Sequence, residues 1–114
     1  MPWTDIFAAW GEDDIPQREE IVTTLATDTV HYADPHSGPV DGRDGLLQVI
    51  AGFRQAMPDG SAAAHHADGY QGHVRAAVDF RRDGQAFMTG QYVAELNADG
   101  AITRLVGFAS MPAS

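Results

Sequence analysis

A chain of 114 residues has the length of one domain, and it is long enough to bury a hydrophobic core without disulfides or metal ions. Seven basic and sixteen acidic residues give a net charge of −9, and such an acidic surface repels nucleic-acid phosphates and anionic lipid. The chain has no cysteine, which excludes disulfides, thiol catalysis and thiolate metal sites. We therefore expect a single domain over residues 1–114 that has no nucleic-acid or membrane partner.

The N-terminal residues lack the basic start and the apolar run of a signal peptide. No apolar stretch approaches the roughly 20 residues that are needed to span a bilayer. These two features predict a cytoplasmic protein.

The first third of the sequence has the spacing of helices. A short helix is predicted to begin at Thr4 or Asp5 and to end at Gly11, where an acidic run follows. A second helix is predicted after the capping residue Asp14, with Pro16 in its first turn.

A short β-prone segment at residues 29–33 leads into residues 34–39, which are dense in turn-forming residues. A third helix is predicted to open at residues 42–44, to carry apolar residues at helical spacing as far as Phe53, and to end at residues 57–60.

The second half of the sequence consists of strands and turns. Residues 62–68 are a weak candidate strand because they are rich in alanine, whereas residues 73–82 and 85–96 alternate clearly and are joined by the hairpin turn Asp83-Gly84. A last strand is predicted over residues 101–109. Helices followed by consecutive antiparallel strands predict an α+β fold. We expect a cone-shaped barrel in which a curved antiparallel sheet wraps around the N-terminal helices and encloses an apolar pocket.

Three short motifs occur in an order and spacing that a known superfamily shares. They are Tyr32-Ala33-Asp34-Pro35, then Gly42-Arg43-Asp44 at a helix start, then Asn97-Ala98-Asp99-Gly100-Ala101-Ile102 leading to Gly107-Phe108. This set resembles the nuclear transport factor 2-like superfamily, in particular its branch of ketosteroid isomerases and SnoaL-like polyketide cyclases. The resemblance supports the cone-shaped fold and implies a homodimer through the outer face of the sheet. It does not fix the function, because this fold hosts isomerases, cyclases, dehydratases, epoxide hydrolases and binding modules.

The resemblance also implies a site. In the isomerases the general base is the aspartate of an Asp-Pro pair at the end of the first strand, which corresponds to Asp34. The two hydrogen-bond donors of the family's oxyanion hole correspond to positions at or near Trp10 and Tyr92, so both donors are changed in this chain. The hydroxyl of Tyr92 remains a candidate donor to an enolate, and the indole of Trp10 is a second one.

The residues themselves leave two interpretations of Asp34 open. An aspartate before proline commonly organises a turn through its own side chain. A carboxylate at the mouth of an apolar pocket is partly desolvated, which suits a general base.

Further residues are predicted to line the pocket. Gly90 shares a strand face with Tyr92 and leaves room on that face for a ligand. For Trp10 and Tyr32, packing in the core is an equally compatible interpretation. The predicted lining residues are Trp10, Tyr32, Phe53, Met88, Gly90 and Phe108.

His65 and His66 are neighbours on a predicted strand, so one of them is expected to face inward, although the sequence does not say which. The inward histidine is a candidate acid/base partner for Asp34. A metal site built from Asp34, His31, His36 and His65 has no supporting ligand spacing, so neither a metal nor a cofactor is predicted.

The functional hypothesis is cofactor-independent acid/base catalysis on a small hydrophobic carbonyl compound. Asp34 removes a carbon-bound proton, and Tyr92 stabilises the enolate. Isomerisation, aldol cyclisation and dehydration share this first step, so the sequence does not separate them. The alternative is a non-catalytic module of the same fold that binds a small ligand or dimerises.

Overall fold

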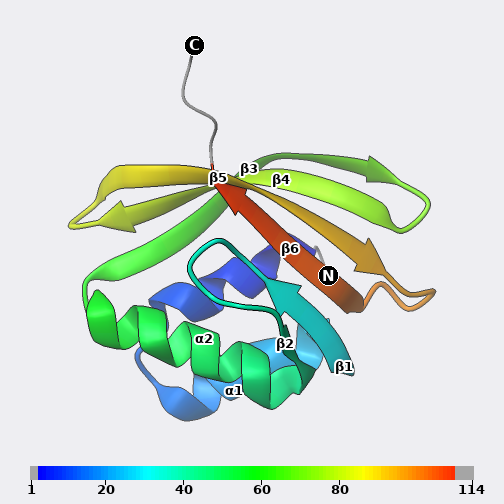
Figure 1. Ribbon diagram of the computed structural model, residues 1–114, viewed down its shortest axis with the longest axis horizontal. Helices are drawn as coiled ribbons and strands as arrows, with labels where there is room; N and C mark the ends of the chain where they lie inside the picture. Colours follow the sequence, from blue (N-terminus) through cyan, green and yellow to red (C-terminus); the bar gives the residue numbers. More distant parts are fainter. Residues whose placement is uncertain (1–2, 110–114) are drawn as a thin grey trace.

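The computed structural model describes residues 3–109, and Figure 1 shows its helices gathered on one face of a curved sheet. A 3-10 helix, η1 (Trp3–Gly11), precedes the two α-helices α1 (Ile15–Leu25) and α2 (Gly42–Ala56). The six strands are β1 (Ala26–Ala33), β2 (Val40–Asp41), β3 (Gly60–Tyr70), β4 (His73–Arg82), β5 (Gln85–Leu96) and β6 (Ile102–Ala109). The predicted α+β class is therefore confirmed.

The sheet has the strand order β2-β1-β6-β5-β4-β3. Strands β3 to β6 form an antiparallel meander, but β1 pairs with β6 in parallel, so the sheet is mixed and the expected antiparallel sheet is wrong at this pair. The alternation of apolar residues specifies which face of a strand is buried and says nothing about the direction of its neighbour. Within residues 3–109, β2 and β3 are the edges of the sheet, which is curved and is not closed into a barrel by hydrogen bonds.

Irregular positions in four strand pairs accompany the curvature. The register shifts between Ala26 and His31 in β1, between His65 and Asp68 in β3, between Phe80 and Arg81 in β4, and near the end of β5. Such bulges bend a strand and increase its local twist. They let the sheet bend around the helices, as Figure 1 shows.

The predicted capping of α1 is present in the structure. The side chain of Asp14 accepts a hydrogen bond from the backbone N–H of Gln17 at 3.2 Å, and Pro16 occupies the first turn. The first helix differs from the prediction only in starting at Trp3, and α2 begins at Gly42, whose φ of 83° suits glycine.

The hydrophobic core lies between the helices and the inner face of the sheet. Its largest fully buried side chains include Phe7, Trp10, Tyr32, Leu46 and Ile50. None of the helices within residues 3–109 is long and apolar enough to cross a membrane.

A buried arginine ties the N-terminal helix to the start of the sheet. The guanidinium of Arg54, which is 8% exposed, donates to the backbone carbonyls of Trp10, Pro58 and Gly60 and pairs with the carboxylate of Asp13. One side chain at the end of α2 therefore fixes η1 against the turn that leads into β3. This matters for the site because Trp10 borders the cavity described next.

Candidate active site

A cavity of about 520 Å³ lies between α2, the loop after β1, and strands β4, β5 and β6. Its walls are mainly apolar, and the large side chains among them are Trp10, Phe53, Met57, Phe80, Phe87 and Met88. Its polar side chains are Asp34, His36, Ser37, Gln48 and Tyr92. A few polar groups on an apolar wall are typical of sites that orient a small ligand.

Five of the residues predicted to line a pocket border this cavity, namely Trp10, Phe53, Met88, Gly90 and Phe108. Tyr32 does not; it is fully buried beside the cavity and packs against the ring of Trp10 at a centroid distance of 5.9 Å. The two candidate catalytic residues, Asp34 and Tyr92, both border the cavity.

Asp34 follows the last residue of β1, and its two carboxylate oxygens have different surroundings. The Oδ1 atom accepts hydrogen bonds from the backbone N–H groups of His36 at 2.8 Å and Ser37 at 2.6 Å, which is the arrangement of a turn organised by aspartate. The Oδ2 atom accepts a hydrogen bond from the hydroxyl of Tyr32 at 2.5 Å. Turn formation therefore occupies Oδ1 and leaves Oδ2 to the hydroxyl of Tyr32.

Two buried tyrosines extend this contact. The hydroxyls of Tyr32 and Tyr92 lie 2.8 Å apart, and the side chains are 0% and 3% exposed. Burial raises the pKa of the Tyr32 hydroxyl far above its ordinary value, and the neighbouring Tyr92 and the hydrogen bond to Asp34 raise it further. Burial also raises the pKa of Tyr92, and the charge of Asp34 adds to this, while the hydrogen bond with Tyr32 acts in the opposite direction. Both hydroxyls keep their protons at neutral pH.

Gly107 determines where the ring of Tyr92 lies. The two residues are paired across β5 and β6, and a Cβ atom on Gly107 would lie 2.5 Å from Cζ of the Tyr92 ring. The ring therefore rests directly on the backbone of β6. A Cβ atom on Gly90 would lie 2.8 Å from the carbonyl oxygen of Phe108, so that glycine allows a close approach of two strands in addition to bordering the cavity. No local sequence pattern indicates the part played by Gly107, which follows from the cross-strand register.

The two adjacent histidines lie away from the cavity. His65 is paired with Ala77 in the β3–β4 ladder, on the face opposite Val78, and its Nε2 atom lies 3.1 Å from Oδ1 of Asp79. His66 is exposed and has a φ of 54°, so the expected alternation of the two side chains breaks down at the bulge. The histidine that does border the cavity is His36, and its position beside Asp34 in the turn was the only signal for it. Within residues 3–109, no three His, Cys, Asp or Glu side chains form a group that could hold a metal ion.

The buried tyrosines make a prediction for alkaline pH. An unfolded chain ionises its tyrosines above about pH 10, whereas the folded protein keeps Tyr32 and Tyr92 protonated, so the unfolded state binds fewer protons there. Their contribution to stability is fully present below about pH 10, and each tyrosine lowers the free energy of unfolding by about 1.4 kcal/mol per pH unit above it. Denaturant unfolding curves at several alkaline pH values measure this slope. The Tyr32→Phe/Tyr92→Phe double variant should show a clearly shallower slope of the unfolding free energy against pH. Phenolate absorbance of both residues in the intact fold would contradict the prediction.

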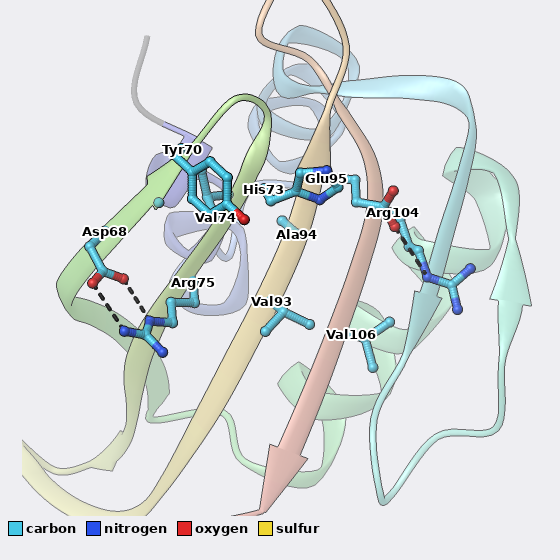
Figure 2. Close-up of a pocket in the computed structure, with 11 residues that line it drawn as sticks. Asp68, Tyr70, His73, Val74, Arg75, Val93, Ala94, Glu95, Arg104 and Val106 are labelled. Carbon is cyan, nitrogen blue, oxygen red and sulfur yellow. Dashed lines mark hydrogen bonds and ion pairs between the residues drawn. The ribbon is translucent and has the colours of Figure 1, made fainter.

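A second hollow, of about 570 Å³, lies on the outer face of strands β3 to β6 (Figure 2). The ion pair of Asp68 with Arg75 lies at one side, with an N–O distance of 2.7 Å, and Glu95 and Arg104 lie at the other, 3.8 Å apart. Val93 and Val106 project between them, and the helices lie behind the sheet in this view. The hollow has no part of the Asp34 turn in its lining.

The sequence profile of the SnoaL-like domain matches residues 3–105. Among curated proteins, none matches the chain. Among solved structures, a protein from Agrobacterium tumefaciens named "putative isomerase of the SnoaL-like family" superposes with a TM-score of 0.83 and 28% identity, and the match covers 92% of this chain and 91% of that one.

Two more distant structures share the fold. A "putative ketosteroid isomerase" from Kribbella flavida has a TM-score of 0.67 at 19% identity, over 98% of this chain and 81% of that one. A "putative SnoaL-like polyketide cyclase" from a Jannaschia species has a TM-score of 0.72 at 14% identity, over 92% and 80%. The match of the profile over nearly the whole length, together with this fold, places the chain in the SnoaL-like domain family.

Proposed function

We propose that the protein is a cofactor-independent enzyme that removes a proton from the carbon next to a carbonyl group, with Asp34 as the general base. The observation that carries the proposal is that Asp34 borders a mainly apolar cavity while its Oδ2 atom takes no part in the backbone hydrogen bonds of the turn. Oδ1 is saturated by two backbone N–H groups, whereas Oδ2 accepts one hydrogen bond and retains a lone pair for a substrate proton. A partly desolvated carboxylate in this position is suited to proton abstraction.

The composition of the cavity wall favours an uncharged, largely apolar substrate. None of the seven arginines, all of which lie within residues 3–109, borders the cavity, and the chain contains no lysine. An anionic compound would find no counter-charge there and would be repelled by Asp34. A cavity of about 520 Å³ lies within the range of sites that enclose a drug-sized molecule.

Tyr92 is the partner proposed for the substrate's carbonyl oxygen. Its ring is held by Gly107 on one side and by the ring of Phe7, at a centroid distance of 5.0 Å, on another. The hydroxyl is thereby held beside that of Tyr32, on a side chain that borders the cavity. With its ring held in place, the hydroxyl can stabilise the enolate oxygen by a hydrogen bond without any movement of the ring. The similarity to a protein named as an isomerase agrees with this class of reaction.

The experiment that tests the function follows the first step and needs no knowledge of the product. Flat aromatic ketones are incubated with the protein in heavy water, and the exchange of their α-protons for deuterium is followed by NMR. Exchange above the buffer rate supports the proposal. Ketones that bind without exchanging their α-protons would instead support the alternative, a binding module without chemistry. The hydrogen bonds of Oδ1 of Asp34 within the turn favour this alternative.

We also propose that the hollow on the outer face of the sheet is covered by a second copy of this chain. Both of its sides carry charges of both signs, and the apolar Val93 and Val106 lie between them, so the surface is complementary to itself after a two-fold rotation. Light scattering at micromolar concentration should therefore report a dimer, and Val93→Glu should convert it to a monomer. The matched change Ala51→Glu, on the exposed side of α2, should leave the dimer intact; a wild-type monomer would contradict the proposal.

A further inference from the structure

Tyr92, Tyr32 and Asp34 form a chain of hydrogen bonds whose direction is set by a count of protons. A tyrosine hydroxyl carries one proton, and an ionised carboxylate carries none. Tyr32 therefore uses its only proton on Oδ2 of Asp34 at 2.5 Å, and in the 2.8 Å contact between the two hydroxyls Tyr92 has to be the donor. The proton of Tyr92 is therefore directed at Tyr32, which does not border the cavity. While Asp34 is ionised, Tyr92 offers the cavity an acceptor.

We propose that Tyr32 is a positioning residue that makes the hydrogen-bond character of Tyr92 depend on whether Asp34 holds a proton. The inference rests on the function proposed above for Asp34. Before proton abstraction Tyr92 offers the cavity only a hydrogen-bond acceptor, and after abstraction it offers a donor. The site thus gains its enolate-stabilising donor only when the enolate exists.

The sequence of events balances without any further reactant. The C–H bond of the substrate breaks, its electron pair remains on the substrate as the enolate, and the proton goes to Oδ2 of Asp34. The neutral acid attracts the proton of Tyr32 less strongly, because hydrogen bonds to a carboxylate are about twice as strong as those to a neutral group. The hydroxyl of Tyr32 then turns to donate to Tyr92, and the hydroxyl of Tyr92 turns to donate to the enolate oxygen. The two tyrosine protons change partners and are not transferred.

Burial limits the hydrogen-bond partners that are available to the two tyrosine hydroxyls. The side chains of Tyr32 and Tyr92 are 0% and 3% exposed, so bulk water does not offer either hydroxyl a competing partner. The rings are fixed by Trp10, Phe7 and Gly107, which leaves rotation of the hydroxyl groups as the available freedom.

An asparagine at position 34 reproduces the protonated state without a charge. The backbone N–H groups of His36 and Ser37 require an acceptor where Oδ1 now lies, so the amide oxygen takes that place. The amide NH₂ group then faces Tyr32 as a donor. Tyr32 must donate to Tyr92, and Tyr92 donates into the cavity.

The test measures the affinity of an uncharged aromatic ketone, which can only accept hydrogen bonds, for five proteins. These are the wild type, Asp34→Asn, Tyr32→Phe and the two double variants that combine Asp34→Asn with Tyr32→Phe or with Tyr92→Phe. The ketone should bind about tenfold more tightly to Asp34→Asn than to the wild type, because it gains a buried hydrogen bond from Tyr92. In the Tyr32→Phe background the same Asp34→Asn change should alter the affinity less than about twofold. Adding Tyr92→Phe to Asp34→Asn should remove the gain.

Two outcomes would overturn the inference. If Asp34→Asn had the same effect with and without Tyr32, removal of the negative charge would explain it. If Tyr32→Phe weakened binding equally to both forms of position 34, Tyr32 would be a structural residue only.

A ligand-free measurement separates a failure of this inference from a failure of the proposed function. A hydroxyl proton in a short hydrogen bond to a carboxylate gives a far-downfield proton NMR signal. We expect this signal in the wild type and in Tyr92→Phe, and we expect it to be lost in Tyr32→Phe. If ketones bound to none of the proteins, the proposed function would be contradicted. The hydroxyl signal would then still test the chain of hydrogen bonds. Absence of this signal from the wild type would overturn the inference.

Discussion

The Asp34→Asn variant is expected to exchange the α-protons of aromatic ketones about a thousandfold more slowly than the wild type, because an amide cannot accept the proton and a positioned general base typically contributes a factor of this size. The fold should be unchanged, since the amide oxygen can accept the two backbone N–H groups that Oδ1 accepts now. Deuterium exchange followed by NMR gives the rate, and thermal unfolding verifies the stability.

The matched control is Asp59→Asn, which changes an exposed aspartate after the end of α2 and should leave the rate unchanged. An Asp34→Asn variant with the full exchange rate would exclude Asp34 as the base. The combination of slower turnover and tighter ketone binding is also informative. A damaged fold would lower both the exchange rate and the affinity for the ketone, whereas a neutral mimic of the protonated base lowers the rate and raises the affinity.

Local signals in the sequence predicted much of the fold. Asp14 and Pro16 defined the start of α1 because a cap and a first-turn proline act within a few residues. The alternation of apolar and polar residues predicted β4 and β5 because each strand buries one face, which in β4 carries Val78 and Phe80.

The sequence did not predict the pairing between strands that are distant in the chain. The β-structure of β1 begins at Ala26, whereas the β-prone residues suggested a start at Thr29, because the parallel contact with β6 extends the strand beyond its own propensity. At the other edge of the sheet, the bulge at His66 removed the alternation on which the inward histidine was predicted.

The candidate site also has residues that the sequence predicted and contacts that it did not predict. Asp34 and Tyr92 were nominated through a resemblance, because each occupies a recognisable place in an ordered set of motifs. The contact between Tyr32 and Tyr92 joins residues that are 60 positions apart, and the space for the Tyr92 ring depends on Gly107 in the next strand. Both features follow from the register of β1, β6 and β5, which local patterns do not encode.

Replacing Arg54 with methionine is expected to lower the free energy of unfolding by about 3 kcal/mol, because backbone carbonyls lose a buried charged donor. Methionine keeps most of the apolar length of the side chain, so the change removes hydrogen bonds more than packing. The carbonyls of Trp10 and Gly60 would be left in buried surroundings, and that of Pro58 in a partly buried one. Denaturant unfolding at neutral pH measures the loss.

Asp13→Asn is the matched control because it removes only the charge of the arginine's partner. Asp13 is 87% exposed, so this change should cost less than about 1 kcal/mol. Equal losses in the two variants would mean that the ion pair holds η1 in place and that the carbonyl contacts contribute little. The larger loss in Arg54→Met would show that the arginine acts as a bridge between backbone segments, and it should also weaken ketone binding, since Trp10 is both a partner of Arg54 and part of the cavity wall.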